Sequence, residues 1–289
     1  SAGKNHSTVI SYDGTLYAWG RNAEGQLGDG TKITPRRAPV KVKSPDGTGE
    51  LAGIVCISSG SGHTSAVKMD GTLWTWGKNS YGQLGINSTD DSTLPVQVHG
   101  ELDRGLLTGV KSVSAGLEHT LALLEDGTVM SWGRNHSGQL GNGNVDDTLF
   151  PVKVHNLAGI ISIDASSSAF SVALKDNGTV WVWGVGRDGQ LGNGTSGEDI
   201  FSSTPLQVSG LTGVRAISAG DAHTLVLKQD GTVWAWGSSC HGQLGDGVCD
   251  SNRWSTHPVQ VLGLGGKGRL QRVRAVACGI HHTIALLDD

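Results

Sequence analysis

Apolar and polar residues alternate along most of this chain in short segments that end at glycine. Residues 119–127, HTLALLEDG, alternate and then finish in an Asp-Gly pair, which is a tight-turn signal. Residues 128–133, TVMSWG, alternate again and carry the β-branched and aromatic residues that strands prefer. We find no segment of about ten residues with the 3.6-residue period of a helix. The pattern therefore predicts an all-β chain of short strands joined by hairpins.

The same pattern recurs five times among the 289 residues. Each copy holds an ungapped unit such as DGTVWAWGSSCHGQLGDG (230–247), and a strand that begins with proline follows it. The other units span 13–30, 70–87, 126–143 and 177–194. One period thus contains four short strands, and sequential four-stranded sheets arranged radially form a β-propeller. A β-helix has shorter coils and a helical solenoid needs a 3.6-residue period, so the predicted fold is a propeller of four-stranded blades.

The repeats predict a single domain over residues 1–289, with five full periods and a partial sixth. The strand led by histidine occurs six times, first at His6 and last at His282, so residues 1–13 and 272–289 are alternative copies of one strand pair. We therefore expect either a section of a longer array or a ring with an incomplete sixth blade. The periods run over approximately 1–57, 58–113, 114–163, 164–217, 218–276 and 277–289.

The fourth period departs from the template. Phe170 stands where the others have histidine, and Ser167 stands where they have glycine. One extra residue also separates Ile163 from Phe170. We expect this blade to be locally irregular.

Composition and charge exclude several classes of function. The net charge is −4 and no block of Lys and Arg is present, so nucleic-acid binding has no support. No run of about 18 apolar residues predicts a membrane span, and no signal peptide is visible. A cytoplasmic location is slightly favoured. Cys240 and Cys249 flank one loop, and they either pair in an oxidising compartment or remain free thiols.

Four signatures, G-x-x-H-[ST], D-G-x-[VL]-x-x-W-G, G-Q-L-G and P-x-x-V, recur in this order. In these motifs the whole chain resembles the regulator of chromosome condensation repeat family, a β-propeller family. The resemblance implies a ring that usually has seven blades, of which this chain holds about five and a third. It also implies several unrelated activities, among them nucleotide exchange on a Ran-type GTPase with chromatin binding, ubiquitin-ligase and kinase accessory domains, a plant UV-B photoreceptor and a bacterial β-lactamase inhibitor. The resemblance thus predicts the scaffold and leaves the target open.

The residues that recur in every period favour structural roles. The GQLG segments, which we call GQLG corners, lack the Lys-Ser/Thr pair of a phosphate loop and fit turns. The recurring histidines could suggest a metal site, but equivalent positions on adjacent blades lie too far apart to share an ion. We expect these histidines to tie neighbouring strands by hydrogen bonds, and the recurring tryptophans to pack between blades. No catalytic, metal or cofactor constellation stands apart from the repeat, so an enzyme is not predicted.

Function is instead expected in the segments that vary between periods, because loops on a rigid scaffold usually carry recognition. Trp254 beside Arg253 is either an exposed anchor for a partner or a residue that folds over its own blade. The acidic pairs Asp90-Asp91 and Asp146-Asp147 are solvated candidates for partner contact. The segments are five corner loops (29–38, 86–94, 142–150, 193–204 and 246–257) and three second insertions (44–53, 100–109 and 263–272).

The leading hypothesis is a non-enzymatic protein-interaction propeller that binds a partner through loops on one face. The alternative is a guanine nucleotide exchange factor for a small Ran-type GTPase, and it depends on the resemblance alone. The exchange factor of the family inserts a hairpin wedge from one blade, and no period here carries an obvious extra hairpin. We expect a protein partner, with no nucleic acid, membrane or cofactor.

Overall fold

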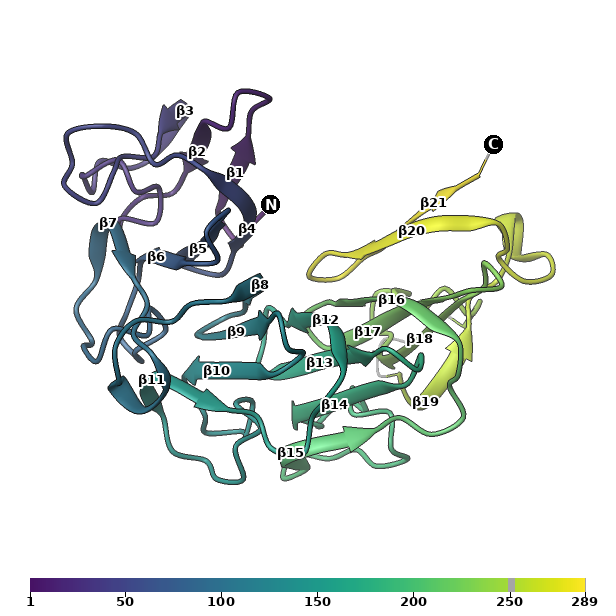
Figure 1. Ribbon diagram of the computed structural model, residues 1–289. Helices are drawn as coiled ribbons and strands as arrows, with labels where there is room; N and C mark the ends of the chain where they lie inside the picture. The colour runs from purple at the N-terminus through teal and green to yellow at the C-terminus, as the bar shows by residue number, and fades with distance from the viewer. Residues whose placement is uncertain (249–252, 289) are drawn as a thin grey trace. The chain divides into compact units, whose positions relative to one another are not determined.

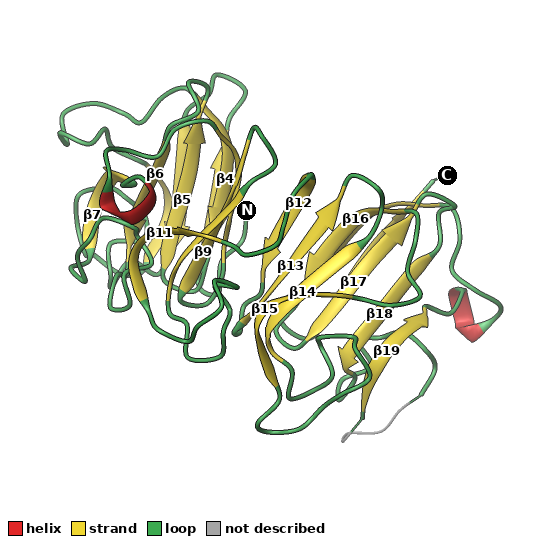
Figure 2. Ribbon diagram, turned by 60° about the horizontal axis from the view of Figure 1, so that its bottom comes forward, coloured by secondary structure: helices red, strands yellow, loops and turns green. Residues whose placement is uncertain are grey.

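A computed structural model describes residues 1–248 and 253–288 of the chain (Figure 1). Within these residues it contains 21 strands and, as helices, only two 3-10 turns of three residues each (Figure 2). The all-β prediction is therefore confirmed. The chain divides into two compact units, residues 1–136 with 145–154 and residues 137–144 with 155–289, which we describe separately.

The first unit contains three antiparallel sheets whose strands follow one another in sequence order. The first sheet has three strands, and the next two have four each. A 3-10 turn, η1 (Glu101–Asp103), follows the second sheet. The strands are β1 (His6–Ile10), β2 (Leu16–Gly20) and β3 (Arg36–Lys41); β4 (Ile54–Ser59), β5 (His63–Lys68), β6 (Leu73–Gly77) and β7 (Ser92–Gln97); and β8 (Val110–Ala115), β9 (His119–Leu124), β10 (Val129–Gly133) and β11 (Thr148–Lys153).

The second unit contains two four-stranded sheets and a final sheet of two strands. A second 3-10 turn, η2 (Leu264–Gly266), precedes the last sheet. The strands are β12 (Ile160–Ala165), β13 (Phe170–Lys175), β14 (Val180–Val185) and β15 (Phe201–Gln207); β16 (Val214–Ala219), β17 (His223–Lys228), β18 (Val233–Ser238) and β19 (Trp254–Gln260); and β20 (Val273–Cys278) and β21 (Thr283–Leu287).

The two ends of the chain differ from the expected duplication of a strand pair. Residues 272–288 form the complete pair β20–β21, but of the corresponding first residues only β1 is a strand. Before it, Ala2 makes an isolated bridge with Ser7. Only the histidine-led strand is therefore duplicated, as β1 and β21.

Buried hydrogen bonds join consecutive sheets of the first unit. At the seam between the first and second sheets, His6 Nε2 bonds Thr64 Oγ1 at 2.8 Å, and Thr64 Oγ1 donates to the carbonyl of Gln26 in the GQLG corner at 2.8 Å. The indole N–H of Trp76 donates to the same carbonyl at 2.9 Å. These bonds confirm the roles expected for histidine and tryptophan. The next seam repeats all three bonds through His63, Thr120, Gln83 and Trp132, each at 2.9 Å.

The seams of the second unit show what the phenylalanine of the fourth period changes. The indole N–H of Trp236 donates to the Gln190 carbonyl at 2.9 Å, as in the first unit. Phe170 has no ring nitrogen to bond the next hydroxyl, and Thr224 Oγ1 is buried without a hydrogen-bond partner among the described residues. The irregularity expected in this period is thus a missing seam hydrogen bond.

The glycine position of the fourth period is taken by Ser166, and the expectation that Ser167 takes it was wrong. The Ser166 amide donates to the Phe170 carbonyl at 3.0 Å, as the Gly220 amide does to His223 at 2.8 Å. A Cβ at Gly220 would lie 2.1 Å from the imidazole of His223, so glycine is required beside the histidine. The extra residue of the fourth period lies after Ser166, whose Oγ accepts the Phe170 amide at 3.1 Å.

Candidate interaction surface

The corner loops leave each sheet at the end where its Trp-Gly strand finishes, which we call the corner end. The second insertions leave at the other end, where the outer strand finishes opposite the start of the Trp-Gly strand. Each corner loop begins where a GQLG corner ends, and the chain returns to that corner after the outer strand. In four periods the second residue after the outer strand donates its amide to the carbonyl of the last glycine of the corner. These bonds join Lys43 to Gly28, His99 to Gly85, His155 to Gly141 and Leu262 to Gly245, at 2.8 to 2.9 Å. The loops therefore occupy equivalent positions, as the repeat predicted.

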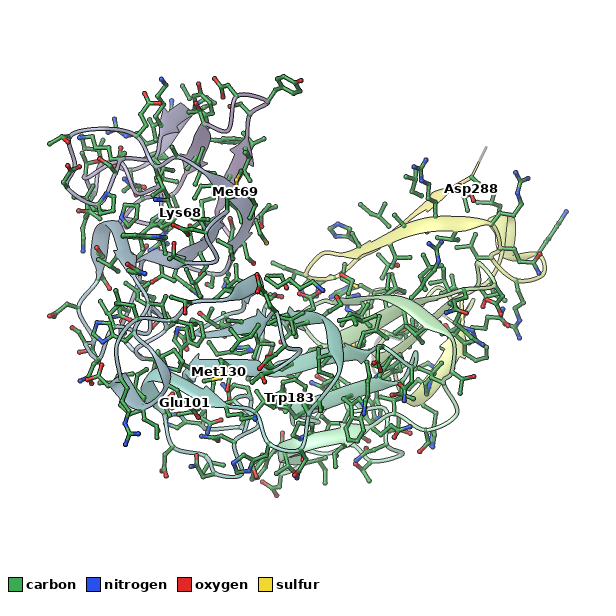
Figure 3. All side chains as sticks on the ribbon, in the orientation of Figure 1. Lys68, Met69, Glu101, Met130, Trp183 and Asp288 are labelled. Carbon is green, nitrogen blue, oxygen red and sulfur yellow. The ribbon has the colours of Figure 1, made fainter. Side chains whose placement is uncertain are left out.

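The uniform Asp-Gly-Thr or Asn-Gly-Thr turns lie at the end from which the second insertions leave, which we call the turn end, since the Met69 amide donates to Gly53 and the Glu125 amide to Gly109. Asp70 illustrates their local bonding, because its carboxylate accepts the amide and the hydroxyl of Thr72. These bonds hold the pKa of Asp70 below its usual value. Met69 lies in this turn and is 80% exposed (Figure 3). The turns are thus nearly invariant in sequence, while the corner loops and the second insertions vary.

In the second and third sheets, an aspartate locks the corner loop onto its corner. Asp91 Oδ1 accepts the backbone amide of Asn79 at 2.9 Å, and Asp147 Oδ1 accepts that of Asn135 at 2.7 Å. Both side chains keep 27% of their surface exposed. Two of the four predicted acidic residues therefore hold a loop in place. Their neighbours Asp90 and Asp146 are exposed, and contact between any of the four and a partner stays a prediction.

In the fourth and fifth sheets, a hydrogen bond between two backbone groups holds the corner loop in place of the aspartate. The Gly186 amide donates to the Ile200 carbonyl, and the Ser239 amide donates to the Arg253 carbonyl, both at 2.8 Å. Strands β15 and β19 are consequently seven residues long, against six for β7 and β11. Each begins with an aromatic residue, Phe201 paired to Val185 and Trp254 paired to Ser238.

These two aromatic side chains are exposed at matching positions of consecutive sheets. Phe201 is 50% exposed and Trp254 is 47% exposed. The Trp254 indole N–H donates to Ser196 Oγ at 2.9 Å, so the ring leans on the preceding sheet's corner loop rather than on its own blade. Sequence reasoning missed Phe201. A signal was available, because Val-Gly and Ser-Ser follow Trp-Gly in these two periods, where the first three have Arg-Asn or Lys-Asn.

Arg253 is largely buried and holds the start of β19 in place through an ion pair with Asp246. Its guanidinium lies 2.8 Å from Asp246 Oδ2, and the two side chains are 27% and 9% exposed. Cys240 Sγ contacts the Arg253 carbonyl at 3.9 Å and belongs to the free cysteines, with Cys56 and Cys278. Cys249 lies outside the described residues, and its pairing with Cys240 is not described. Arg253 thus holds the start of β19, while Trp254 faces outward.

A cluster of charged and aromatic side chains joins the second and third sheets at the end where their Trp-Gly strands finish. Glu118 contacts Lys78 at 2.6 Å and Arg134 at 2.7 Å. Burial raises the pKa of Glu118, but the hydrogen bonds from Lys78 and Arg134 outweigh it, and the net shift is downward. The Arg134 guanidinium also lies 4.9 Å from the centre of the Tyr81 ring. Sequence reasoning missed this cluster, which combines separately unremarkable positions of two periods.

The described residues contain no group of three or more His, Cys, Asp or Glu side chains placed to hold a metal ion. In the same part of the chain, no helix has the length and apolar character needed to cross a membrane.

Comparisons with known proteins place the chain in a family. Residues 1–213 match the RCC1-like domain, and residues 214–243 and 230–286 match the regulator of chromosome condensation (RCC1) repeat. The chain is 36% identical over 289 residues to the human E3 ubiquitin-protein ligase HERC2, covering 99% of this chain and 6% of HERC2. It is 33% identical over 290 residues to the ultraviolet-B receptor UVR8 of Arabidopsis thaliana, covering 100% of this chain and 62% of UVR8. The chain therefore spans less than two thirds of these relatives.

Solved structures show the same fold. Human WBSCR16 superimposes with a TM-score of 0.80 at 23% identity, over 99% of this chain and 71% of that one. Yeast RCC1 (Prp20), solved with Kap60, superimposes with a TM-score of 0.81 at 21% identity, over 99% of this chain and 67% of that one. The sheets are thus the blades of an RCC1-type β-propeller fold. The match to the RCC1-like domain over most of its length shows that the chain belongs to the RCC1 repeat family.

Proposed function

We propose that the chain is a non-enzymatic protein-interaction propeller that binds a protein partner chiefly through its corner loops, to which the second insertions add apolar side chains. The observation that carries the proposal is the distribution of exposed apolar side chains. Of the sixteen large apolar side chains exposed in the described chain, eight lie in these eight short segments. They are Ile33, Leu102, Leu106, Val145, Phe201, Val248, Trp254 and Leu264. Five of the eight lie in corner loops and three in second insertions, and exposed apolar residues that gather in variable loops are typical of a binding surface.

Trp254 is the proposed anchor. Phe201 occupies the matching position on the preceding blade, at the start of the outer strand. A tryptophan that is half exposed can bury a large area against a partner at low cost in side-chain entropy. Arg253 keeps its charge paired with Asp246 and positions the anchor. The carboxylates of Asp90, Asp91, Asp146 and Asp147 supply the polar rim, which tunes association rate more than affinity.

The proposal is tested by capture of partners from a matched cell lysate with quantitative mass spectrometry. We expect the variant Trp254→Ala with Phe201→Ala to lose at least one protein that the unaltered chain captures. Met69→Ala is the matched control, because it removes an exposed apolar side chain that lies outside the corner loops, at the other end of its sheet. The proposal fails if the double variant captures the same proteins as the control. It also fails if no protein is captured while a small molecule raises the melting temperature.

An alternative function is guanine nucleotide exchange on a small Ran-type GTPase, and one structural observation favours it. Isolated bridges close three second insertions into short hairpins, Lys43 with Glu50, His99 with Leu106 and Leu262 with Arg269. The sequence had suggested no obvious extra hairpin. A solved structure of yeast Prp20p was described together with that protein's binding to Gsp1p and histones.

The hairpin of residues 99–106 is the best candidate for a wedge. Leu102 and Leu106 are 54% and 52% exposed on it, and Asn87 Nδ2 donates to Asp103 Oδ2 at 2.8 Å, which braces it against a corner loop. Release of a fluorescent nucleotide from a Ran-type GTPase measures this activity. Acceleration by the chain that Leu102→Ala with Leu106→Ala abolishes is the expected result. No acceleration ends the alternative and leaves the interaction proposal standing.

A further inference from the structure

The corner loop of the first sheet is closed at the same position as those of the second and third sheets, but by a hydroxyl. Thr34 Oγ1 accepts the backbone amide of Asn22 at 3.0 Å. In the next two sheets the acceptor is a carboxylate oxygen, of Asp91 and of Asp147, and in all three sheets it lies 12 residues after the donor. Thr34 therefore occupies the place of an aspartate.

The segment around Thr34 is exposed and strongly basic. Residues 30–45 contain five Lys and Arg and no Asp or Glu, in a chain whose net charge is −4. Thr34 itself is exposed, and so is Arg37. Lys32 precedes Thr34 by two residues and Arg36 follows it by two. A negative charge placed on Thr34 would therefore have basic side chains on both sides of it along the chain.

The residues that follow Thr34 are those that one class of protein kinase selects. Pro35 comes directly after the hydroxyl residue, and Arg37 lies three positions after it. Proline-directed kinases select proline at the first of these positions, because their pocket there offers no acceptor for a backbone N–H and proline has none. Among them, the cyclin-dependent kinases also prefer a basic residue at the second position. The segment TPRR (34–37) satisfies both requirements.

Two other hydroxyl residues of the chain precede a proline, and neither satisfies both requirements. Ser44 precedes Pro45, but the residue three positions after it is Gly47. Thr204 lies inside strand β15, and the residue three positions after it is Gln207. Thr34 is thus the hydroxyl residue that combines an exposed loop, a following proline and a basic residue at the third position.

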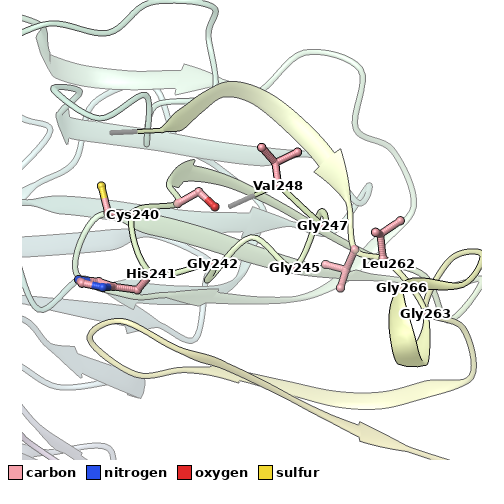
Figure 4. A pocket seen from close by; sticks show the side chains of 11 residues that line it. Cys240, His241, Gly242, Gly245, Gly247, Val248, Leu262, Gly263 and Gly266 are labelled. Atoms are coloured by element: carbon pink, nitrogen blue, oxygen red, sulfur yellow. The ribbon is translucent and has the colours of Figure 1, made fainter. Parts of the chain in front are cut away.

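The fifth sheet shows a corner-loop lock that modification of a side chain could not change. Ser239 stands at the position of Asn22, and its amide donates to the backbone carbonyl of Arg253. Ser239 also lines a cavity of about 580 Å³, together with Cys240 and His241 (Figure 4). Both groups of this lock belong to the backbone, whereas the acceptor in the first sheet is a side-chain hydroxyl that an enzyme can modify.

We propose that Thr34 is a phosphorylation site for a proline-directed protein kinase, and that its phosphate takes over the lock of this corner loop. The kinase transfers the γ-phosphoryl group of ATP. A bond forms between the γ-phosphorus and Thr34 Oγ1, the bond from that phosphorus to the bridging oxygen breaks, and ADP leaves. The hydroxyl proton passes to the catalytic base of the kinase. The Asn22 amide then donates to a phosphate oxygen, as the Asn79 amide donates to Asp91.

The change of acceptor strengthens the lock. Before modification, a neutral hydroxyl accepts the Asn22 amide, and one neutral hydrogen bond on an exposed loop is weak enough for the loop to open to a kinase. After modification, the acceptor carries about two negative charges, and hydrogen bonds to charged acceptors are roughly twice as strong as neutral ones. Phosphorylation thus gives the first sheet the kind of lock that Asp91 and Asp147 provide in the next two.

Treatment of the folded chain with a purified cyclin-dependent kinase and ATP tests the site. Mass spectrometry should show one added phosphate, located on Thr34, with Ser44 and Thr204 unmodified. Thr34→Ala should abolish the addition. Arg37→Ala leaves the hydroxyl and its hydrogen bond to Asn22 in place, and it should slow the addition by about tenfold, because the kinase loses a charged contact. Ser44→Ala is the matched control and should be modified like the unaltered chain.

Amide hydrogen exchange of Asn22 tests the lock. This amide should exchange about tenfold more slowly in the phosphorylated chain, and more slowly in Thr34→Asp without any kinase. The Asn79 amide already has a carboxylate acceptor and should exchange as before. The proposal is overturned if the folded chain is not phosphorylated on Thr34, if Arg37→Ala is modified as fast as the unaltered chain, or if Asn22 exchange does not slow. Neither measurement involves a protein partner, so each of these outcomes leaves the proposed function standing.

Discussion

At each described seam, the glutamine carbonyl of a GQLG corner accepts a hydrogen bond from the following blade. The Gln83 carbonyl accepts both the hydroxyl of Thr120 and the indole N–H of Trp132, and the two donor side chains are fully buried. A carbonyl oxygen has two lone pairs, and these two donors occupy both, so the loss of either donor removes one buried hydrogen bond. Trp19 of the first blade occupies the equivalent strand position but is partly exposed.

Trp132→Phe should destabilise the protein by about 2–4 kcal/mol, because it removes a buried hydrogen bond and leaves a small cavity. Trp19→Phe should cost less than about 1 kcal/mol. Thermal unfolding followed by circular dichroism compares the two variants with the unaltered chain. Equal shifts of the melting temperature would contradict the role assigned to the seam hydrogen bond.

The seam histidines make the fold sensitive to acid. Burial lowers the pKa of His6, His119 and His223 to about 4 and that of His63 to about 3, against an ordinary value of 6.5. Each imidazole is therefore neutral in the folded state, and the unfolded state binds its proton first as the pH falls. Their contribution to stability is complete above pH 6.5 and is lost between about pH 6.5 and pH 4, or pH 3 for His63.

His63→Phe copies the natural substitution at Phe170 and should weaken this acid sensitivity. Between pH 7 and pH 5, one such histidine accounts for roughly 2 kcal/mol of lost stability. The variant loses the bond to Thr120 and so starts with a lower melting temperature at pH 7. Its melting temperature should then fall less steeply towards pH 5 than that of the unaltered chain. Parallel pH profiles for the two proteins would rule out a titrating His63.

At the scale of elements, the corner loops differ in how they are locked. A carboxylate holds the loop of the second and third blades, and a backbone carbonyl holds that of the fourth and fifth. The second kind of lock lengthens the outer strand by one residue and presents an aromatic side chain at its start. The loops therefore differ in geometry as well as in sequence.

Asp91→Ala should lower the urea midpoint of unfolding by an amount equivalent to about 1–2 kcal/mol, because the Asn79 amide loses a charged acceptor. Asp90→Ala is the matched control and should change stability by no more than about 0.5 kcal/mol, since its side chain is exposed and contacts only Ser88 among the described residues. If the two variants unfold at the same midpoint, Asp91 is a surface residue rather than a lock.

The sequence alone predicted the strands, turns and corners. It did not predict the hydrogen bonds that hold the corner loops to their corners. The Asp-Gly-Thr turns, the Trp-Gly strands and the GQLG corners recur without gaps, so their positions followed from the repeat. The serine that replaces glycine was predicted one position too late. The sequence allows the extra residue on either side of this serine, and only the hydrogen bond from the Ser166 amide to the Phe170 carbonyl identifies the position. Phe201 was missed because its exposure depends on the hydrogen bond between Gly186 and Ile200, whose one sequence signal is the change after Trp-Gly from Arg-Asn or Lys-Asn to Val-Gly.

At the scale of the whole molecule, repeated residues build the scaffold and variable residues carry its specificity. The repeat predicted the propeller and the location of the variable loops. It could not predict which apolar side chains in those loops stay exposed, since Ile33 is 58% exposed while Ile200 packs into the core of its blade. The candidate surface thus becomes visible only when the loops are folded onto their corners.

The most direct test of this account is amide hydrogen exchange of the chain with and without a partner captured by it. We predict slower exchange in the corner loops, strongest around Ser196, Phe201 and Trp254. The turns that contain Tyr12 and Met69, which are exposed at the opposite end, should exchange as in the free chain. Protection of those turns with unchanged exchange in the corner loops would contradict the assignment of partner binding to the corner end.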